Sequence, residues 1–207
     1  MIRQPRARKP NPLSEPEDLR AELNALRTEV ERLATELTDM RAHASLLESL
    51  AQEDPLTGLL NRRGLFRDLA RAVAYRARYS TPIALLLADL DGFKAINDAH
   101  GHEAGDRALV HLATLLRNNV RSSDSVGRLG GDEFGIILWQ VDETSAIQKA
   151  ASLEALIAGS PLRNGGGTFA LASSIGTAML QAKETPEEAL SRADRAMYIR
   201  KEARRAP

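Results

Sequence analysis

The stretch Arg128-Leu-Gly-Gly-Asp-Glu-Phe134 is the most informative part of the chain, because two glycines are followed at once by two carboxylates. Glycine permits the positive φ of a tight hairpin turn, and without a Cβ it lets a ligand approach the backbone closely. The flanking segments, 125–129 and 134–139, are typical of β-strands. The carboxylates would place hard oxygen ligands at the hairpin tip, which suits Mg²⁺ bound to a nucleotide. On this segment alone, a turn with two solvated acids is an equal alternative.

The composition indicates one ordinary globular domain with an appendage. The 207 residues carry 28 basic and 28 acidic side chains, and 43% of the residues are hydrophobic. A net charge of zero gives no sign of nucleic-acid binding, and no apolar run is long enough to predict a membrane segment. The absence of cysteine excludes disulfides and thiolate metal sites and fits the cytoplasm, where we expect the protein to act. Residues 1–15 are expected to form a disordered basic tail.

The sequence predicts a coiled coil over residues 16–52. Apolar residues there alternate at spacings of four and three, which is a heptad repeat. The repeat consists of Leu19, Leu23, Leu26, Val30, Leu33, Leu37, Met40, Ala44, Leu47 and Ala51. A parallel dimer would pair charged neighbours of this seam: Glu22 with Arg27, Glu36 with Arg41, and His43 with Glu48. We therefore expect a parallel homodimer through residues 19–51; the alternative is an amphipathic helix that packs on its own domain.

Residues 53–207 are expected to form one α+β domain, in which helices cover a sheet. Pro and Gly in the segment 53–59 should end the coil. The expected helices span 61–79, 93–98, 105–118, 143–158 and 186–204, and the expected strands span 83–90, 125–129, 134–139 and 169–178. The strand at 83–90 is apolar on both faces, so it should lie in the centre of the sheet.

The central strand ends in Asp89-Leu90-Asp91. A carboxylate at the end of a buried strand needs a partner, because an unpaired buried charge is costly. Asp89 could therefore share one divalent metal ion with Asp132 and Glu133. For Asp91 we expect a structural role, as the N-cap of the next helix, over a functional one.

Two polar residues in the helical region that follows suggest guanine recognition. Asn97 and Asp106 would suit that base, because a carboxylate accepts from N1–H and N2–H₂ while an amide serves O6 or N3. Spacing alone supports this pair only weakly.

Together these motifs resemble those of the GGDEF-domain diguanylate cyclases. The matching segments are 54–63, 89–94 with 97–98, 101–106, 128–134, 174–176, and 193–198 with Lys201 and Arg205. The resemblance covers the chain from about residue 53 to its end, and this number of ordered motifs at family spacing makes a chance match very rare. It implies a palm-like α+β fold with a central, mainly antiparallel sheet covered by helices.

The resemblance also implies a reaction, in which two GTP are condensed into cyclic di-GMP and two pyrophosphates. The metal ligands would be Asp89, the carbonyl of Leu90, Asp132 and Glu133, holding two Mg²⁺ (or Mn²⁺) ions per half-site. Asp132 or Glu133 would be the general base, and the sequence does not choose between them. The GTP-binding residues would be Phe93, Lys94, Asn97, His102, Asp106, Lys201 and Arg205.

The resemblance gives the coil a function. Each domain would bind one GTP, so the active species would be a dimer with two facing half-sites. The coil would raise the effective concentration of one domain near the other, and freedom at Asp54-Pro55 would then set the activity. Arg121-Ser-Ser-Asp124 lies at the spacing of the family's inhibitory RxxD site, which implies that cyclic di-GMP binds there and inhibits.

Four positions depart from the family pattern. Leu60 stands where proline is frequent, His100 replaces an aromatic residue, Arg200 replaces a small residue and Arg204 replaces a glycine. The two arginines would make the phosphate-binding end of the last helix more basic, which puts the role of Arg205 in doubt.

Three other functions stay open at this point. One is a receptor that binds cyclic di-GMP without catalysis, and another is a different nucleotide cyclase with a similar palm-like fold. The third is a coiled-coil dimerisation module in which the acidic residues are idle.

Overall fold

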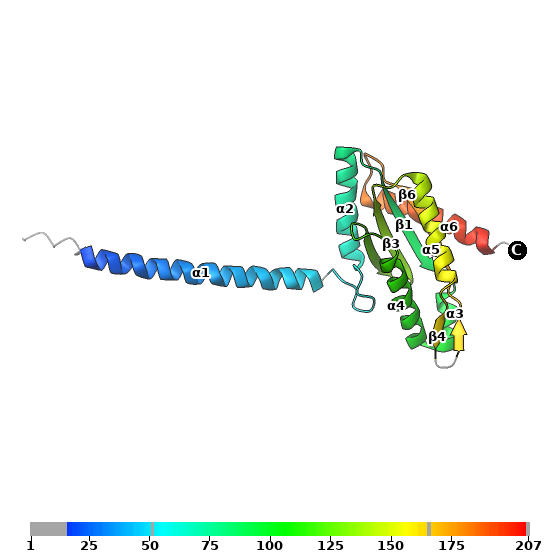
Figure 1. Cartoon of the computed structure of the whole chain (residues 1–207), viewed down its shortest axis with the longest axis horizontal. Helices are drawn as coiled ribbons and strands as arrows, with labels where there is room; N and C mark the ends of the chain where they lie inside the picture. Colours follow the sequence, from blue (N-terminus) through cyan, green and yellow to red (C-terminus); the bar gives the residue numbers. More distant parts are fainter. Residues whose placement is uncertain (1–15, 51, 165–166, 206–207) are drawn as a thin grey trace, which may run out of the picture. The chain divides into compact units, whose positions relative to one another are not determined.

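The computed structural model describes residues 16–50, 52–164 and 167–205 (Figure 1). The chain divides into two compact units, residues 1–49 and 50–207, and each is described by itself. The tail expected over residues 1–15 lies outside the described residues. Within the described residues, no helix is both long and apolar enough to span a membrane.

The first unit contains one long helix, α1 (Pro16–Leu50), which confirms the helix expected from the heptads. The apolar residues of its seam are exposed; Leu33, for example, is 50% exposed and Val30 is 64% exposed. Arg32 contacts both Glu29 and Glu36 along the same helix. The side chains of the expected pair His43 and Glu48 lie outside the described part. A helix with such an exposed stripe fits a coiled coil, in which a second helix would cover the stripe.

The second unit is built on a sheet of four strands, in which every neighbouring pair is antiparallel. Its strands are β1 (Ile83–Leu90), β2 (Ser125–Gly130), β3 (Glu133–Trp139) and β6 (Ser173–Met179), in the order β2-β3-β1-β6. All eight residues of β1 are buried, so the prediction of a central strand is confirmed. The α+β fold with a mainly antiparallel sheet is also confirmed.

Helices cover both faces of this sheet (Figure 1). Successive residues of β1 point to opposite faces. Leu85 and Leu87 pack against α2 (Arg62–Tyr79) and α6 (Pro186–Arg205), whereas Ala84 and Leu86 pack in a second core with α4 and α5. The helices of that second core are α4 (His102–Asn118) and α5 (Glu143–Ala158). The short helix α3 (Phe93–His100) follows β1.

Two predicted boundaries differ from the structure by three residues or more. Helix α4 begins at His102 rather than at residue 105, directly after Gly101, whose φ is 80°. The strand expected over 169–178 is two strands: β5 (Gly167–Phe169) pairs with β4 (Leu162–Asn164), and β6 begins only at Ser173. The small β4–β5 hairpin was not predicted.

Two of the departures from the family pattern have local explanations. His100 at the end of α3 stacks on Phe169, with ring centroids 5.2 Å apart. Leu60 donates its backbone N–H to the carbonyl of Val126 at 3.2 Å, a bond that proline could not make.

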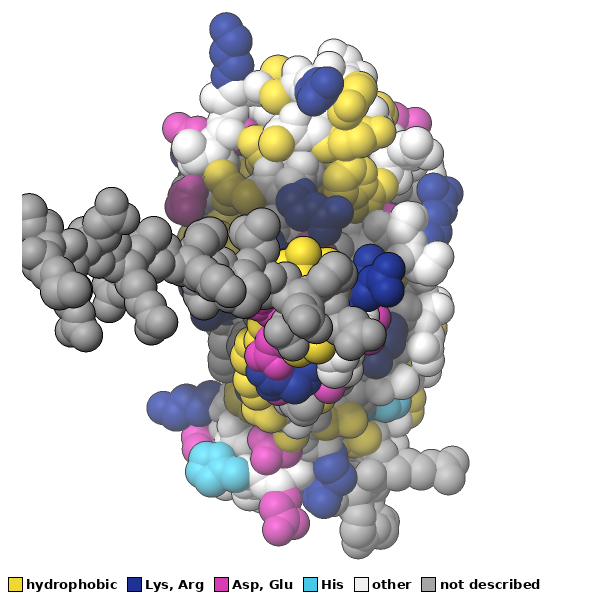
Figure 2. Space-filling model, turned by 90° about the vertical axis from the view of Figure 1, so that its left-hand side faces the viewer, with side chains coloured by type: hydrophobic (Ala, Val, Ile, Leu, Met, Phe, Trp, Pro, Cys, Tyr) yellow, Lys and Arg dark blue, Asp and Glu magenta, His cyan; other side chains and the backbone are white. Residues whose placement is uncertain are grey.

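The face of the molecule seen in Figure 2 carries acidic and basic side chains that are interspersed.

Candidate functional site

The hairpin between β2 and β3 is shaped by its two glycines. Gly130 and Gly131 have φ angles of 145° and 53°, which side-chain-bearing residues rarely adopt. No neighbouring atom lies within 4 Å of the Cβ position of either glycine, so the tip stands open to a ligand. Arg128 braces the tip, since its Nε and Nη2 donate to the Gly131 carbonyl at 3.0 and 2.8 Å. The predicted hairpin is therefore present, with Asp132 in the turn and Glu133 directly after it.

The same arginine connects the tip to the segment that begins the domain. Arg128 Nη1 lies 3.3 Å from Asp54, and both side chains are only 16% exposed. Asp54 also accepts from the backbone N–H and the hydroxyl of Thr57, at 2.8 and 2.7 Å. Burial alone would raise the pKa of Asp54, but the Thr57 hydrogen bonds and the Arg128 charge outweigh it and lower the pKa. These bonds do not support the expected freedom at Asp54-Pro55.

Acidic side chains gather at one end of β1 and β3. Asp89 and Glu133 are register partners on these strands, and Leu90 donates its N–H to the Asp132 carbonyl at 3.2 Å. Burial raises the pKa of Glu133, and the negative charges of Asp89, Asp132 and Asp194 raise it further. Asp194 lies on α6 and was missed as a member of this group, because only the fold brings it near the hairpin.

Lys201 of α6 completes the group, since its ammonium contacts the Asp89 carboxylate. Asp89 is 7% exposed, so the lysine supplies the partner that its buried charge requires. The structure thus places one of the expected phosphate-binding residues beside the first expected metal ligand. The side chain of Arg205, in the last turn of α6, lies outside the described part.

The acidic group fits a divalent cation chemically. Among the described residues, no three acidic, histidine or cysteine side chains form a ready-made metal cage. Mg²⁺ seldom needs one, because it is usually held by one or two carboxylates together with waters and substrate phosphates. The crowding of negative charge that raises the pKa of Glu133 is what such a cation would relieve. Asp89, the Leu90 carbonyl, Asp132 and Glu133 are the residues that would hold it.

The turn after β1 has a shape suited to phosphate. Gly92 is the N-cap of α3 with φ 72°, and no side chain caps the helix there. The first amides of a helix lack intrahelical acceptors, so those of Phe93 and Lys94 are available to an anion. Our prediction that Asp91 caps α3 was wrong. Its carboxylate instead accepts from the Ser174 hydroxyl at 3.0 Å, because the antiparallel pairing of β1 with β6 brings the two residues together.

The expected guanine-binding residues lie on α3 and α4, two helices that pack against each other. The Oδ1 atom of Asn97 is buried and has no hydrogen-bond partner among the described residues. A Cβ on Gly105 would lie 1.9 Å from that oxygen, so the glycine makes room for the amide. Asp106 is the next residue along α4, and His102 lies four residues before it, on the same side of the helix. Both are exposed, as is Lys94 on α3.

The two arginines that depart from the family pattern do not lie free at the phosphate end of α6. Both Arg200 and Arg204 pair with Glu154 of α5, with Nη2–Oε2 distances of 2.7 and 3.0 Å. No local sequence pattern predicts this pairing, because Glu154 lies 46 and 50 residues away from its partners.

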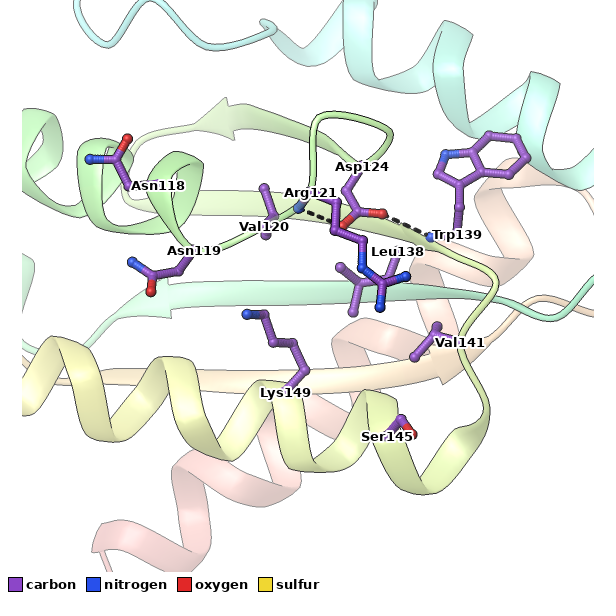
Figure 3. Close-up of a pocket in the computed structure, with 10 residues that line it drawn as sticks. All are labelled: Asn118, Asn119, Val120, Arg121, Asp124, Leu138, Trp139, Val141, Ser145 and Lys149. Atoms are coloured by element: carbon purple, nitrogen blue, oxygen red, sulfur yellow. Dashed lines mark hydrogen bonds between the residues drawn. The ribbon is translucent and has the colours of Figure 1, made fainter.

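A hollow lies at the end of the sheet opposite the acidic group, beside Arg121 and Asp124 (Figure 3). It has a volume of about 460 Å³ and extends between the turn before β2 and α5. Figure 3 shows the side chains of Arg121 and Lys149 extending into the same space. Both oxygens of Asp124 are used locally: they accept from the backbone N–H groups of Arg121 and Trp139, at 2.9 and 3.1 Å. Asp124 therefore shapes the turn, and the Arg121 side chain is exposed.

Comparison with known proteins agrees with this geometry. The family model "Diguanylate cyclase, GGDEF domain" matches residues 51–207. The diguanylate cyclase DosC of Escherichia coli (strain K12) is 40% identical over 149 residues, which are 72% of this chain and 32% of that protein. The diguanylate cyclase TpbB of Pseudomonas aeruginosa (strain UCBPP-PA14) is 36% identical over 191 residues, 91% of this chain and 43% of that protein. The chain thus spans about a third to under half of the length of these relatives.

A solved structure supports the same assignment for both units of the chain. It contains the coiled coil and GGDEF domain of DgcB from Caulobacter crescentus, in complex with cyclic di-GMP. Its TM-score is 0.77 and its sequence identity is 25%, covering 86% of this chain and 95% of that one. The hairpin, the acidic group and the helical region that follows β1 therefore occur in a fold and sequence context that is known. The chain belongs to the GGDEF-domain diguanylate cyclase family.

Proposed function

We propose that this chain condenses two GTP molecules into cyclic di-GMP and two pyrophosphates. The observation that carries the proposal is the acidic group at the end of β1 and β3, which lies beside a turn with open amides and Lys201. The named relatives are diguanylate cyclases, and none of the expected hairpin residues is replaced in this chain. The proposed catalytic domain is residues 53–207, and the cytoplasm is its proposed location because GTP is available there.

In this proposal, Asp89, the Leu90 carbonyl, Asp132 and Glu133 hold two Mg²⁺ (or Mn²⁺) ions in each half-site. Bound there, the ions would neutralise the triphosphate and activate the ribose 3′-hydroxyl for in-line attack on the α-phosphorus. Asp132 and Glu133 are both retained as candidates for the general base. Either carboxylate would have to lie within hydrogen-bond reach of the 3′-hydroxyl of the facing GTP.

The remaining site residues bind and orient GTP. The amides of Phe93 and Lys94 and the side chains of Lys94, Lys201 and Arg205 bind the phosphates. Asn97 and Asp106 bind guanine, with His102 nearby on α4. The close fit of Asn97 against Gly105 supports this role, because it fixes the amide whose N–H groups would donate to guanine O6 or N3.

The reaction requires two half-sites, and we propose that α1 supplies them by forming a parallel homodimer through residues 19–51. The exposed heptad stripe supports this, since burying one leucine side chain contributes roughly 1.5–3 kcal/mol. The dimer would raise the local concentration of the second catalytic domain, which otherwise meets the first only by diffusion.

We further propose that cyclic di-GMP binds beside Arg121 and inhibits the enzyme. The exposed guanidinium of Arg121 and the ammonium of Lys149 line one hollow, and together they could bind a phosphate or a guanine edge. Arg121→Ala should weaken inhibition by at least about tenfold, since a charge-assisted contact contributes roughly 1.5–3 kcal/mol. Inhibition is measured as the initial rate against added cyclic di-GMP. Arg107→Ala is a control at an exposed arginine of α4, and equal inhibition of parent and Arg121→Ala would refute the site.

The function itself is tested by incubating the full chain, freed of bound nucleotide, with GTP or ATP and Mg²⁺. We expect cyclic di-GMP from GTP and no cyclic dinucleotide from ATP. Product from ATP would favour the different nucleotide cyclase. Cyclic di-GMP binding without any turnover by a confirmed dimer would favour the receptor.

A further inference from the structure

Glu154 of α5 is a buried carboxylate that the proposed reaction does not use. It is 5% exposed, and its Oε1 atom accepts from the backbone N–H of Ile175 at 2.8 Å. Arg200 donates to both of its oxygens, at 3.2 and 2.7 Å, and Arg204 lies 3.0 Å from Oε2. A buried carboxylate is tolerated only with such partners, so this side chain is fixed in place.

These bonds lie at the open edge of β6, where they bind its unpaired backbone groups. β6 is an edge strand, and residues two apart on a strand direct their backbone groups to the same side. On the open side of β6, Glu154 takes the N–H of Ile175, while Arg204 Nη1 donates to the carbonyl of Ser173 at 2.6 Å. The charged cluster thus satisfies the backbone groups that an edge strand leaves unpaired.

The cluster also joins two helices that cover opposite faces of the sheet. α5 packs in the core with α4, and α6 packs in the core with α2, so Glu154 connects the two layers around the edge of β6. Arg204 reaches one element more, since its Nη1 lies 3.5 Å from Asp91 in the turn after β1. The C-terminal half of α6 is therefore tied to the end of the sheet that carries the acidic group.

Lys201 lies between the two arginines on α6, and it contacts Asp89. We propose that Glu154 is a positioning residue for the GTP site: by binding Arg200 and Arg204, it fixes Lys201 beside the Asp89 carboxylate. Arg200 and Arg204 are then parts of this clamp and do not bind phosphate. The inference rests on the proposed function. It explains both departures from the family pattern on α6, Arg200 and Arg204, by their pairing with Glu154.

The first test measures the clamp in the full chain without nucleotide. Glu154→Gln keeps an acceptor for Ile175 and removes the charge that holds both arginines, while Arg195→Gln changes an exposed arginine of α6 outside the cluster. We expect amide hydrogen exchange in residues 197–204 to accelerate by at least about fivefold in Glu154→Gln and to stay at the parent rate in Arg195→Gln. Equal exchange in all three proteins would overturn the proposal, whether or not the chain is a cyclase.

The second test asks whether Arg204 acts through Glu154 or through the substrate. If the clamp positions Lys201, Glu154→Gln should raise the KM for GTP by at least about fivefold, with a smaller change in kcat. Adding Arg204→Ala to Glu154→Gln should then raise KM by less than Arg204→Ala does in the parent, because the contact with Glu154 is already lost and only the contacts of Arg204 with Ser173 and Asp91 remain. An undiminished effect of Arg204→Ala in that background would show direct phosphate binding and overturn the proposal.

Arg200→Gln is the reserve variant if Glu154→Gln unfolds, because it leaves Glu154 paired with Arg204. It should raise KM in the same direction, and an unchanged KM together with unchanged exchange would count against the clamp. A parent chain without cyclase activity would refute the proposed function, and the exchange measurement would still decide the clamp.

Discussion

Replacing Gly176 with alanine should push α6 away from the sheet and destabilise the domain. Gly176 lies in β6, and a Cβ built on it would lie 2.1 Å from the backbone nitrogen of Met197 and 2.3 Å from the carbonyl oxygen of Ala193. Both atoms belong to the backbone of α6, so neither can rotate away. Ordinary contact begins at 3.4 Å, so α6 would have to move by about 1.3 Å, the difference from 2.1 Å.

Overpacking of this kind costs typically 1–3 kcal/mol, and we expect about 3 kcal/mol here because the clash is with backbone. For a domain of this size, that corresponds to a fall in Tm of roughly 6–12 °C. The displacement would also pull Lys201 from Asp89, so GTP binding should weaken as well.

The assay is urea unfolding of the full chain, followed by far-ultraviolet circular dichroism. Gly159→Ala is the matched control, because its Cβ would come no closer than 3.3 Å to any neighbour and its φ is −81°. The control should differ from the parent by less than about 1 kcal/mol. A Gly176→Ala protein as stable as the control would refute the described packing of α6 on β6.

Three further predictions concern the segment that begins the domain, the expected guanine-binding residues and the coil. Asp54→Asn should destabilise the domain by about 1–3 kcal/mol at neutral pH. Because the pKa of Asp54 lies below its ordinary 3.8 in the folded protein, its contribution is present above that pH and is lost as pH falls below it. Unfolding measured across this range should show the two proteins converging in acid, and a constant difference would contradict the pairing with Arg128. Gly105→Ala would place a Cβ 1.9 Å from Asn97 Oδ1 and so displace the amide. The Kd for GTP, measured by calorimetry, should therefore rise about tenfold. An unchanged Kd would show that Asn97 does not bind GTP. Leu33→Asp should convert the proposed dimer into monomers in sedimentation experiments, and Thr35→Asp, outside the heptad seam, should not; a dimer that survives Leu33→Asp would contradict the coiled coil.

The parts of the fold that local sequence determines were predicted accurately. The bounds of β1 and α5 were correct, because the first is apolar on both faces and the second begins after an Asp142 N-cap and ends before a glycine. The hairpin was correct because only glycine suits the φ angles at its tip. Among the residues named from the GGDEF motifs, the structure brings Asp89, Glu133 and Lys201 together at one end of the sheet.

The errors and omissions arose where a partner distant in the sequence decides the role of a side chain. Asp91 bonds to Ser174 instead of capping α3, and Asp194 joins the acidic group only after α6 packs on the sheet. Glu154 reads in the sequence as one more polar residue of a helix, yet it is buried with two arginines. Such pairings depend on how helices from two layers meet at a sheet edge, and local sequence patterns do not predict this packing.

The acidic group and the hollow beside Arg121 lie at opposite ends of β3. The acidic group lies where β1 and β3 meet the hairpin tip, whereas Asp124 accepts from Trp139 at the other end of β3. β3 is buried over most of its length, so product bound at the proposed inhibitory site would act either by shifting this strand or by keeping the two half-sites of the proposed dimer apart.

The most direct test of the account is the Mg²⁺-dependent formation of cyclic di-GMP by the parent chain and by Asp132→Ala, with Glu187→Ala as a control at an exposed acid of α6. Products are separated by chromatography after incubation with GTP, and the dimeric state of each protein is confirmed beforehand. We expect product from the parent and the control, at comparable rates, and a loss of at least about 100-fold in Asp132→Ala. Comparable turnover by Asp132→Ala, or turnover by the parent when divalent ions are chelated, would contradict a metal-dependent reaction at the hairpin.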